Sequence, residues 1–114
     1  MTMKKIQIAL VSKETLPVFY MINELRPDEV YLVGTKETKN EMHYIKDVAK
    51  NIGVVCHELT TQPDSMQDCM KVCDSVHARN GEDCEYCYNL TCGTKLMAFG
   101  ALICAQSHKT NDVY

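Results

Sequence analysis

The order of apolar and polar positions along the chain predicts that short strands alternate with helices. Short, β-rich apolar runs bounded by turn residues are typical of buried strands. Four such runs are present, at 5–11, 29–34, from 54 onward and at 83–90. Three stretches between them carry apolar residues at helical spacing. The stripes are Val18, Met21, Ile22 and Leu25; Met42, Ile45, Ala49 and Ile52; and Met66, Cys69, Cys73 and Val76.

This alternation predicts an α/β fold of Rossmann-like type, with a mostly parallel sheet and helices on both faces. We expect residues 1–114 to form a single domain with strand order 3-2-1-4. Asp112-Val113-Tyr114 is expected to begin a fifth strand that the chain leaves incomplete, as if the domain were truncated at its C-terminus. Ligands of such sheets bind at the carboxyl ends of the strands, where the strand order reverses. The turns 12–15 and 91–95 should therefore line one crevice.

The turn between the fourth strand and the last helix is the strongest candidate for chemistry. It reads Thr91-Cys92-Gly93-Thr94-Lys95. A strand that feeds directly into a helix leaves backbone N–H groups unpaired, and these groups together with the helix dipole favour a bound anion. Lys95 adds a mobile positive charge. The turn is not a P-loop, because Thr94 precedes Lys95. The alternative is a plain connection in which Thr94 only caps the helix.

Four further residues are weaker candidates for the same site. Ser12 and Thr15 follow the first strand, where they serve equally well as helix-capping residues. Thr35 and Lys36 follow the second strand, and the alternative for them is a solvated turn.

An unbroken run of ten apolar or glycine residues, 96–105, predicts a helix with no polar face for water. We expect this helix to form a dimer interface, since an outer helix of a small domain has one side that faces away from the core. Gly100 would allow a partner helix to approach closely. The alternative is full burial inside one monomer.

Composition and charge limit the classes of function that the chain can have. Of the 114 residues, 46% are hydrophobic and 24% charged, as in an ordinary globular domain. The net charge of −3 argues against general binding to duplex nucleic acid. Neither a signal peptide nor an apolar run of about 18–20 residues is visible, so we expect a cytoplasmic protein without membrane contact.

Seven cysteines supply a rival function. Cys69, Cys73, Cys84 and Cys87 are four thiols at a spacing that suits zinc, which would make the chain a metal- or thiol-dependent regulatory module. Cys69 and Cys73 lie on an apolar helix face, however, and Cys84 and Cys87 point to opposite sides of a strand. We therefore expect reduced cysteines, no metal site and no cofactor.

Two other expectations concern single side chains. Cys92 precedes a helix and stands near Lys95, which makes it the cysteine that we single out for reactivity. The four histidines are scattered, and we expect all of them at the surface or at helix edges.

Three motifs resemble the CRISPR-associated Rossmann fold (CARF) family. They are Leu10-Val11-Ser12 with Thr15 and Pro17, Gly34-Thr35-Lys36, and Asn89-Leu90-Thr91-Cys92-Gly93-Thr94-Lys95-Leu96-Met97. The last motif is similar to the branch with the signature turn Asn-Leu-Thr-Gly-Gly-Thr-Lys, often found ahead of a nuclease domain. The resemblance implies a homodimeric sensor that binds a cyclic oligoadenylate, the second messenger of type III CRISPR defence. It leaves the ring size open.

Carried over by position, Ser12 and Thr15 would contact the ligand, Thr35 and Lys36 would flank it, and 91–95 would cradle ribose and phosphate. Some family members cleave their ligand without a metal, and Ser12 and Lys95 are the candidates for that alternative activity. Two features depart from the family pattern. Cys92 replaces the first glycine of the turn, where we expect strain or reshaping. Nothing in the chain resembles a nuclease domain, so it is either a fragment or a domain that works alone.

Overall fold

A four-stranded parallel sheet forms the centre of the fold in this computed structural model, which describes residues 3–114. The strands are β1 (Lys4–Leu10), β2 (Glu29–Gly34), β3 (Val55–Thr60) and β4 (Cys84–Asn89). Their order in the sheet is β3-β2-β1-β4, and every neighbouring pair is parallel. The predicted fold class and strand order are confirmed.

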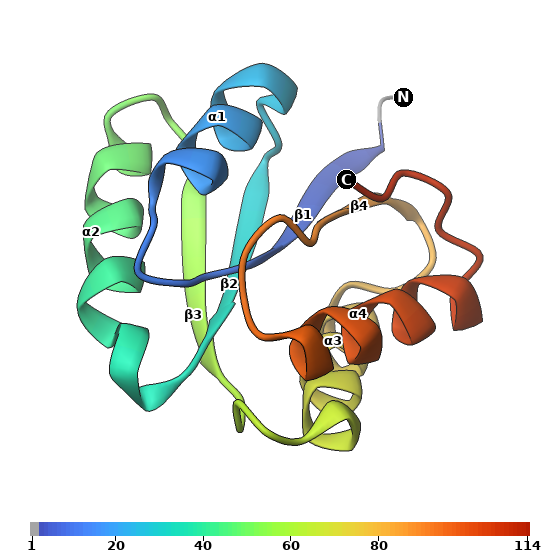
Figure 1. Cartoon of the computed structure of the whole chain (residues 1–114). Coiled ribbons are helices and arrows are strands. Elements are labelled where there is room, and N and C mark those ends of the chain that lie inside the picture. The colour runs from blue at the N-terminus through green and yellow to red at the C-terminus, as the bar shows by residue number, and fades with distance from the viewer. Residues whose placement is uncertain (1–2) are drawn as a thin grey trace.

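Helices cover both faces of this sheet (Figure 1). The helices α1 (Leu16–Leu25) and α2 (Lys39–Lys50) lie on one face, and a 3-10 turn, η1 (Lys36–Thr38), precedes α2. The helices α3 (Met66–Asn80) and α4 (Lys95–Ser107) lie on the other. Right-handed crossovers explain this division. The chain moves outward from β1 to β3 and then returns to β4 on the far side of β1, which reverses the face that its crossover helix covers.

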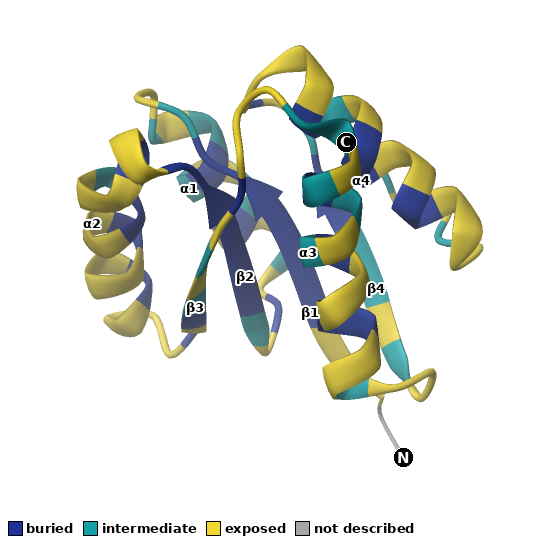
Figure 2. Cartoon of the chain, turned by 90° about the horizontal axis from the view of Figure 1, so that it is seen from below, coloured by how far each residue is buried: buried dark blue, intermediate teal, exposed yellow. Residues whose placement is uncertain are grey.

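The core follows the alternation of side chains along the strands. Ile6, Ile8 and Leu10 of β1 pack against the α3 and α4 side, while Ala9 and Val11 pack against the α1 and α2 side. Figure 2 shows the largely buried central strands β1 and β2 between mostly exposed outer helix surfaces. A strand buried on both faces needs apolar residues at most positions, which is why β2 and the buried part of β1 are mostly apolar, with Gln7 as the polar exception.

The last residues of the chain run beside the outer edge of β4. Val113 forms a parallel bridge with Tyr88, and the Leu90 amide donates to the Tyr114 carbonyl at 2.7 Å. This short pairing is the counterpart of the incomplete fifth strand expected from the sequence.

Two predicted helix details are wrong. Ile52 lies beyond the end of α2 and is 40% exposed, because the helix stops at Lys50. Gly100 was predicted to allow a helix of another chain to approach closely, but the structure gives it a different role. A β-carbon at Gly100 would clash with the Met66 carbonyl oxygen, so this glycine allows α3 of the same chain to approach α4.

The location of His77 also differs from the prediction made from the sequence. Its side chain is buried, with the residue 7% exposed, and its Nε2 lies 2.7 Å from the Tyr88 hydroxyl. Burial, helped by the nearby His108, lowers the pKa of His77 to about 4, so the ring is neutral at pH 7. The expectation that every histidine lies at the surface or a helix edge fails here.

The four cysteines considered for zinc do not converge. Cys69, Cys73 and Cys84 belong to the cluster on the α3 and α4 side of the sheet. Cys87 lies opposite Gln7 in the strand register and points to the other face. Within residues 3–114, no helix is both long and apolar enough to cross a membrane.

Candidate functional site

The turns that follow β1 and β4 meet at one edge of the sheet. The two strands run in register to Ala9 and Asn89. Beyond them, the Cys92 Sγ donates to the Glu14 carbonyl at 3.6 Å. A β-carbon on Gly93 would lie 3.1 Å from Cβ of Leu10. The turns 12–15 and 91–95 are therefore neighbours, as strand order 3-2-1-4 requires.

Asn89, the last residue of β4, anchors the 91–95 turn. It is fully buried, and its Oδ1 accepts hydrogen bonds from the Thr91 amide at 3.2 Å and the Thr91 hydroxyl at 2.6 Å. Its Nδ2 donates to the Pro17 carbonyl at 3.4 Å, which ties the turn to α1. This role of Asn89 was not predicted from the sequence. The sequence feature that could have indicated it is an asparagine two residues before a threonine in a turn, because asparagine side chains commonly accept hydrogen bonds from the backbone two residues on.

Gly93 shapes the turn through its backbone. Its φ is +89°, a conformation that side chains rarely adopt, and Leu10 and Met97 leave little room for a β-carbon. Cys92 is different, because its φ is not positive. Its side chain is 8% exposed and packs in the cluster that contains Val11 and Val18. The expected strain at Cys92 is therefore absent, and its thiol faces the core.

Helix α4 starts at this turn with free backbone donors. Thr94 caps the helix: its Oγ1 accepts from the Met97 amide at 3.2 Å and donates to the Pro63 carbonyl at 2.7 Å. The structure thus shows the predicted helix cap at Thr94. Within residues 3–114, the amides of residues 92–96 have no hydrogen-bond acceptor. Lys95 is exposed at the first position of α4. Unpaired amides at the positive end of a helix are suited to bind an anion.

The turn after β1 adds hydroxyl groups. Ser12 is half-buried, and its Oγ accepts from the Glu14 amide at 3.3 Å. Thr15 stands at the N-cap position of α1 but makes no side-chain capping bond, so its hydroxyl remains available. The capping interpretation fails for Thr15.

The turn after β2 lies beside the turn after β1. Thr35 is buried, and its amide donates to the Thr38 Oγ1 at 2.9 Å, so it is not a solvated turn residue, whereas Lys36 is exposed. Lys13, which sequence reasoning missed, connects the first two turns. Its Nζ donates to the Glu37 carbonyl at 2.6 Å.

The 91–95 turn presents an open surface. None of its residues lines the cavities of about 820, 360 and 150 Å³ found in residues 3–114. A ligand at this edge would be covered only partly by one chain.

The sequence matches the family model described as the Card1 CARF domain over residues 6–114. The chain belongs to the CARF family. Among curated proteins, none matches the sequence significantly.

Three solved structures are similar to this chain in fold. Can2 from Sulfobacillus thermosulfidooxidans, in complex with cyclic tetra-adenylate, superposes with a TM-score of 0.83 at 20% identity over 93% of this chain. A type III CRISPR defence DNA nuclease activated by cyclic oligoadenylate gives 0.77 at 24% identity over 91%. Protein VC1899 from Vibrio cholerae gives 0.74 at 13% identity over 93%. This domain spans only 30%, 17% and 29% of those chains, respectively.

Proposed function

We propose that this CARF domain is a sensor of type III CRISPR signalling that binds a cyclic oligoadenylate at the turns 12–15 and 91–95. The observation that carries the proposal is the adjacency of these turns, with unpaired amides at the start of α4. Family membership supports it, as does the similarity of the fold to Can2, which was solved with cyclic tetra-adenylate.

The chemistry of the two turns fits such a ligand. A cyclic oligoadenylate carries one phosphate and one ribose 2′-OH per nucleotide. The amides of 92–96, the dipole of α4 and the Lys95 ammonium would bind phosphate. The hydroxyls of Thr15 and Thr91 would contact ribose. Because the net charge is −3, attraction of the anionic ligand must come from these local groups.

We further propose that the domain acts as a homodimer through the outer face of α4. That face exposes an apolar stripe whose members are 37–55% exposed: Leu96, Phe99, Leu102 and Ile103. Since α4 begins at the 91–95 turn, a two-fold axis beside the stripe would bring two copies of that turn near each other. A ring of repeated nucleotides would then meet a pair of equivalent sites.

Binding and cleavage are separated by one experiment. The full chain is mixed with cyclic tri-, tetra- and hexa-adenylate separately, and its melting temperature and the integrity of each ligand are measured. A sensor raises the melting temperature with one ring size and returns the ligand intact. Linear products would indicate the ring nuclease alternative, for which Ser12 and Lys95 are the first residues to substitute. If none of the rings shifts the melting temperature, the proposal is wrong.

A further inference from the structure

The C-terminal ends of α3 and α4 bring four metal-binding side chains together. The helices pack in parallel, with Gly100 in the first half of α4 beside Met66 at the start of α3. Near their ends, α3 presents Asp74 and His77, three residues apart, and Cys104 and His108 at the end of α4 are four residues apart. Pairs at these spacings lie on one helix face.

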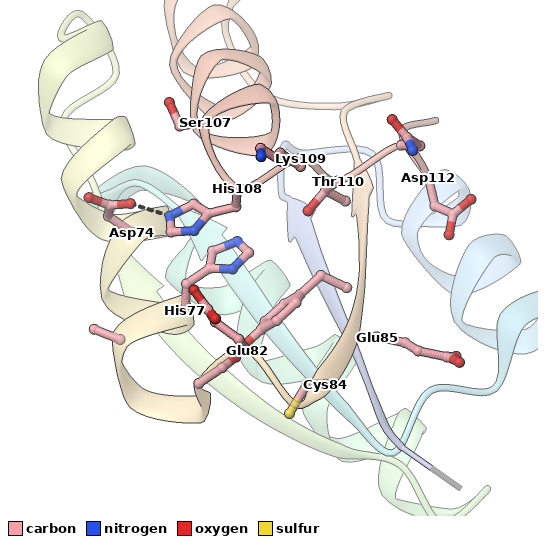
Figure 3. Close-up of a pocket in the computed structure, with 14 residues that line it drawn as sticks. Asp74, His77, Glu82, Cys84, Glu85, Ser107, His108, Lys109, Thr110 and Asp112 are labelled. Carbon is pink, nitrogen blue, oxygen red and sulfur yellow. Dashed lines mark hydrogen bonds and ion pairs between the residues drawn. The ribbon is translucent and has the colours of Figure 1, made fainter.

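The geometry of this cluster is close to that of an ion site. One ligand atom from each of His77, Cys104 and His108 lies within 4.8 Å of the others. The Asp74 Oδ1 lies 2.6 Å from the His108 Nε2 and accepts from the Cys104 Sγ at 3.6 Å. Figure 3 shows Asp74 pointing at His108, with the His77 ring beneath it. The two imidazole rings are stacked, with centroids 3.7 Å apart.

We propose that His77, Cys104 and His108, with Asp74 as the fourth ligand, bind one divalent transition metal ion of the zinc class. Two imidazoles, a thiolate and a carboxylate are a donor set that tetrahedral Zn²⁺ accepts. Bonds of about 2.0–2.3 Å require ligand atoms about 3.3–3.7 Å apart. The ligand atoms must therefore move closer together when the ion binds. His108 can make this movement, because its side chain is 33% exposed and it follows the last residue of α4.

Surrounding groups favour a cation at this position. The buried Tyr88 hydroxyl lies 2.7 Å from the His77 Nε2 and donates to the Cys104 Sγ at 3.4 Å, so it orients both side chains. The negative ends of two helix dipoles converge here.

The cluster also has a route to solvent. It opens on the cavity of about 820 Å³, whose lining includes Asp74, His77 and His108. Three further carboxylates, from Glu82, Glu85 and Asp112, line the same cavity with one lysine, Lys109. An excess of negative charge in a concave site attracts cations.

The competing interpretation is a purely structural hydrogen-bond cluster, in which an Asp74–His108 ion pair covers His77 and no ion binds. The two interpretations differ in one observable. Only a metal site produces thiolate–metal bonding at one ion per chain.

Cobalt titration of the reduced, metal-free full chain tests the proposal. Co²⁺ in a tetrahedral site with a thiolate shows intense visible d–d bands and a near-ultraviolet charge-transfer band. We expect both bands to saturate at one Co²⁺ per chain and to vanish when Zn²⁺ is added. Absence of the bands at saturating Co²⁺ would overturn the proposal.

Variants locate the site. His108→Ala should keep the fold because the side chain is partly exposed, and should weaken Co²⁺ binding at least about tenfold. His43→Ala is its matched control, an exposed histidine 3.6 Å from both Asp47 and Glu58, and should leave the affinity unchanged.

The thiol is tested in the same way. Cys104→Ser should abolish the charge-transfer band, and Cys56→Ser, which removes a buried cysteine on the other side of the sheet, should not. If His108→Ala retains wild-type affinity, or the band survives in a folded Cys104→Ser variant, the assignment is wrong. If Cys104→Ser does not fold, the Co²⁺ titration of His108→Ala alone tests the assignment.

Discussion

At the scale of single residues, Gly93 is the position where the backbone most constrains the site. The signature turn that the sequence resembles has two glycines, and in the structure only the second position, Gly93, has a positive φ. Sequence reasoning identified the turn but expected strain at Cys92. Which of two neighbouring positions needs a positive φ depends on where Leu10 and Met97 pack, and the residue types in the turn do not determine that.

Gly93→Ala should destabilise the fold and disrupt the site. We expect a loss of about 1–2 kcal/mol in the free energy of unfolding, because a β-carbon at φ +89° is strained and meets Leu10. Chemical denaturation measures the stability, and a binding assay with cyclic oligoadenylate should show weaker binding.

Gly53→Ala is the control for that change. Its φ is +78°, but nothing lies within 4 Å of its β-carbon position, and it is remote from both turns. It should lose similar stability and keep wild-type affinity. Equal losses of affinity in both variants would show that Gly93 acts only through global stability.

Cys92→Gly recreates the two-glycine turn that the sequence resembles and should not improve binding. The variant removes a buried side chain and adds backbone freedom, so we expect about 1–2 kcal/mol less stability. Affinity for the ligand should remain within a factor of about two, because the thiol points into the core. Calorimetric binding measurements on both proteins check this. A clear gain in affinity would mean that Cys92 occupies space the ligand needs.

At the scale of elements, the sequence predicted each strand and its neighbours, because apolar runs and helical stripes report local periodicity. The fourth strand, expected at 83–90, spans Cys84–Asn89, and the last helix, expected at 96–105, spans Lys95–Ser107. Local periodicity does not specify which residues of distant elements come into contact. His77 is buried because β4 and the end of α4 close over it, and Gly100 is needed because α3 passes beside it.

The start of α3 offers a prediction about pH. The Thr61 hydroxyl and the Gln62 amide donate to the Asp68 carboxylate at 2.7 and 2.9 Å, and these bonds hold the pKa of Asp68 below its usual value. A lowered folded-state pKa contributes stability above the unfolded pKa of about 4 and loses it as the pH falls. Because Asp68 is largely solvated, the contribution is under about 1 kcal/mol.

Asp68→Asn tests this contribution through denaturant unfolding at several pH values. The variant should be slightly less stable than the wild type at pH 7, and the difference should shrink below about pH 4. Asp64→Asn, an exposed neighbour in the preceding loop, is the control. A difference that stays constant down to pH 2 would contradict the role given to the ionised carboxylate.

At the scale of the whole molecule, the proposed ligand site requires two chains to meet along α4. Phe99→Glu places a charge in the centre of the exposed stripe, where Phe99 is 55% exposed. We expect the dimer to dissociate, with a weakening of at least about a hundredfold, because a buried unpaired charge costs several kcal/mol. Sedimentation velocity measures the change.

Leu16→Glu is the matched control, since Leu16 is 76% exposed at the start of α1, away from that stripe. It should leave the association state unchanged. A wild-type chain that is monomeric at every concentration, or a Phe99→Glu variant that remains dimeric, would remove α4 as the interface.

Titration calorimetry with cyclic tri-, tetra- and hexa-adenylate measures whether the domain binds such a ring at the 91–95 turn. We expect one ring size to bind, with one ring per two chains. Lys95→Ala should weaken binding about tenfold to a hundredfold, the effect of losing a charged hydrogen bond, while Lys71→Ala on the exposed surface of α3 should not. No binding to any ring, or equal affinities for wild type and Lys95→Ala, would contradict the proposed binding site.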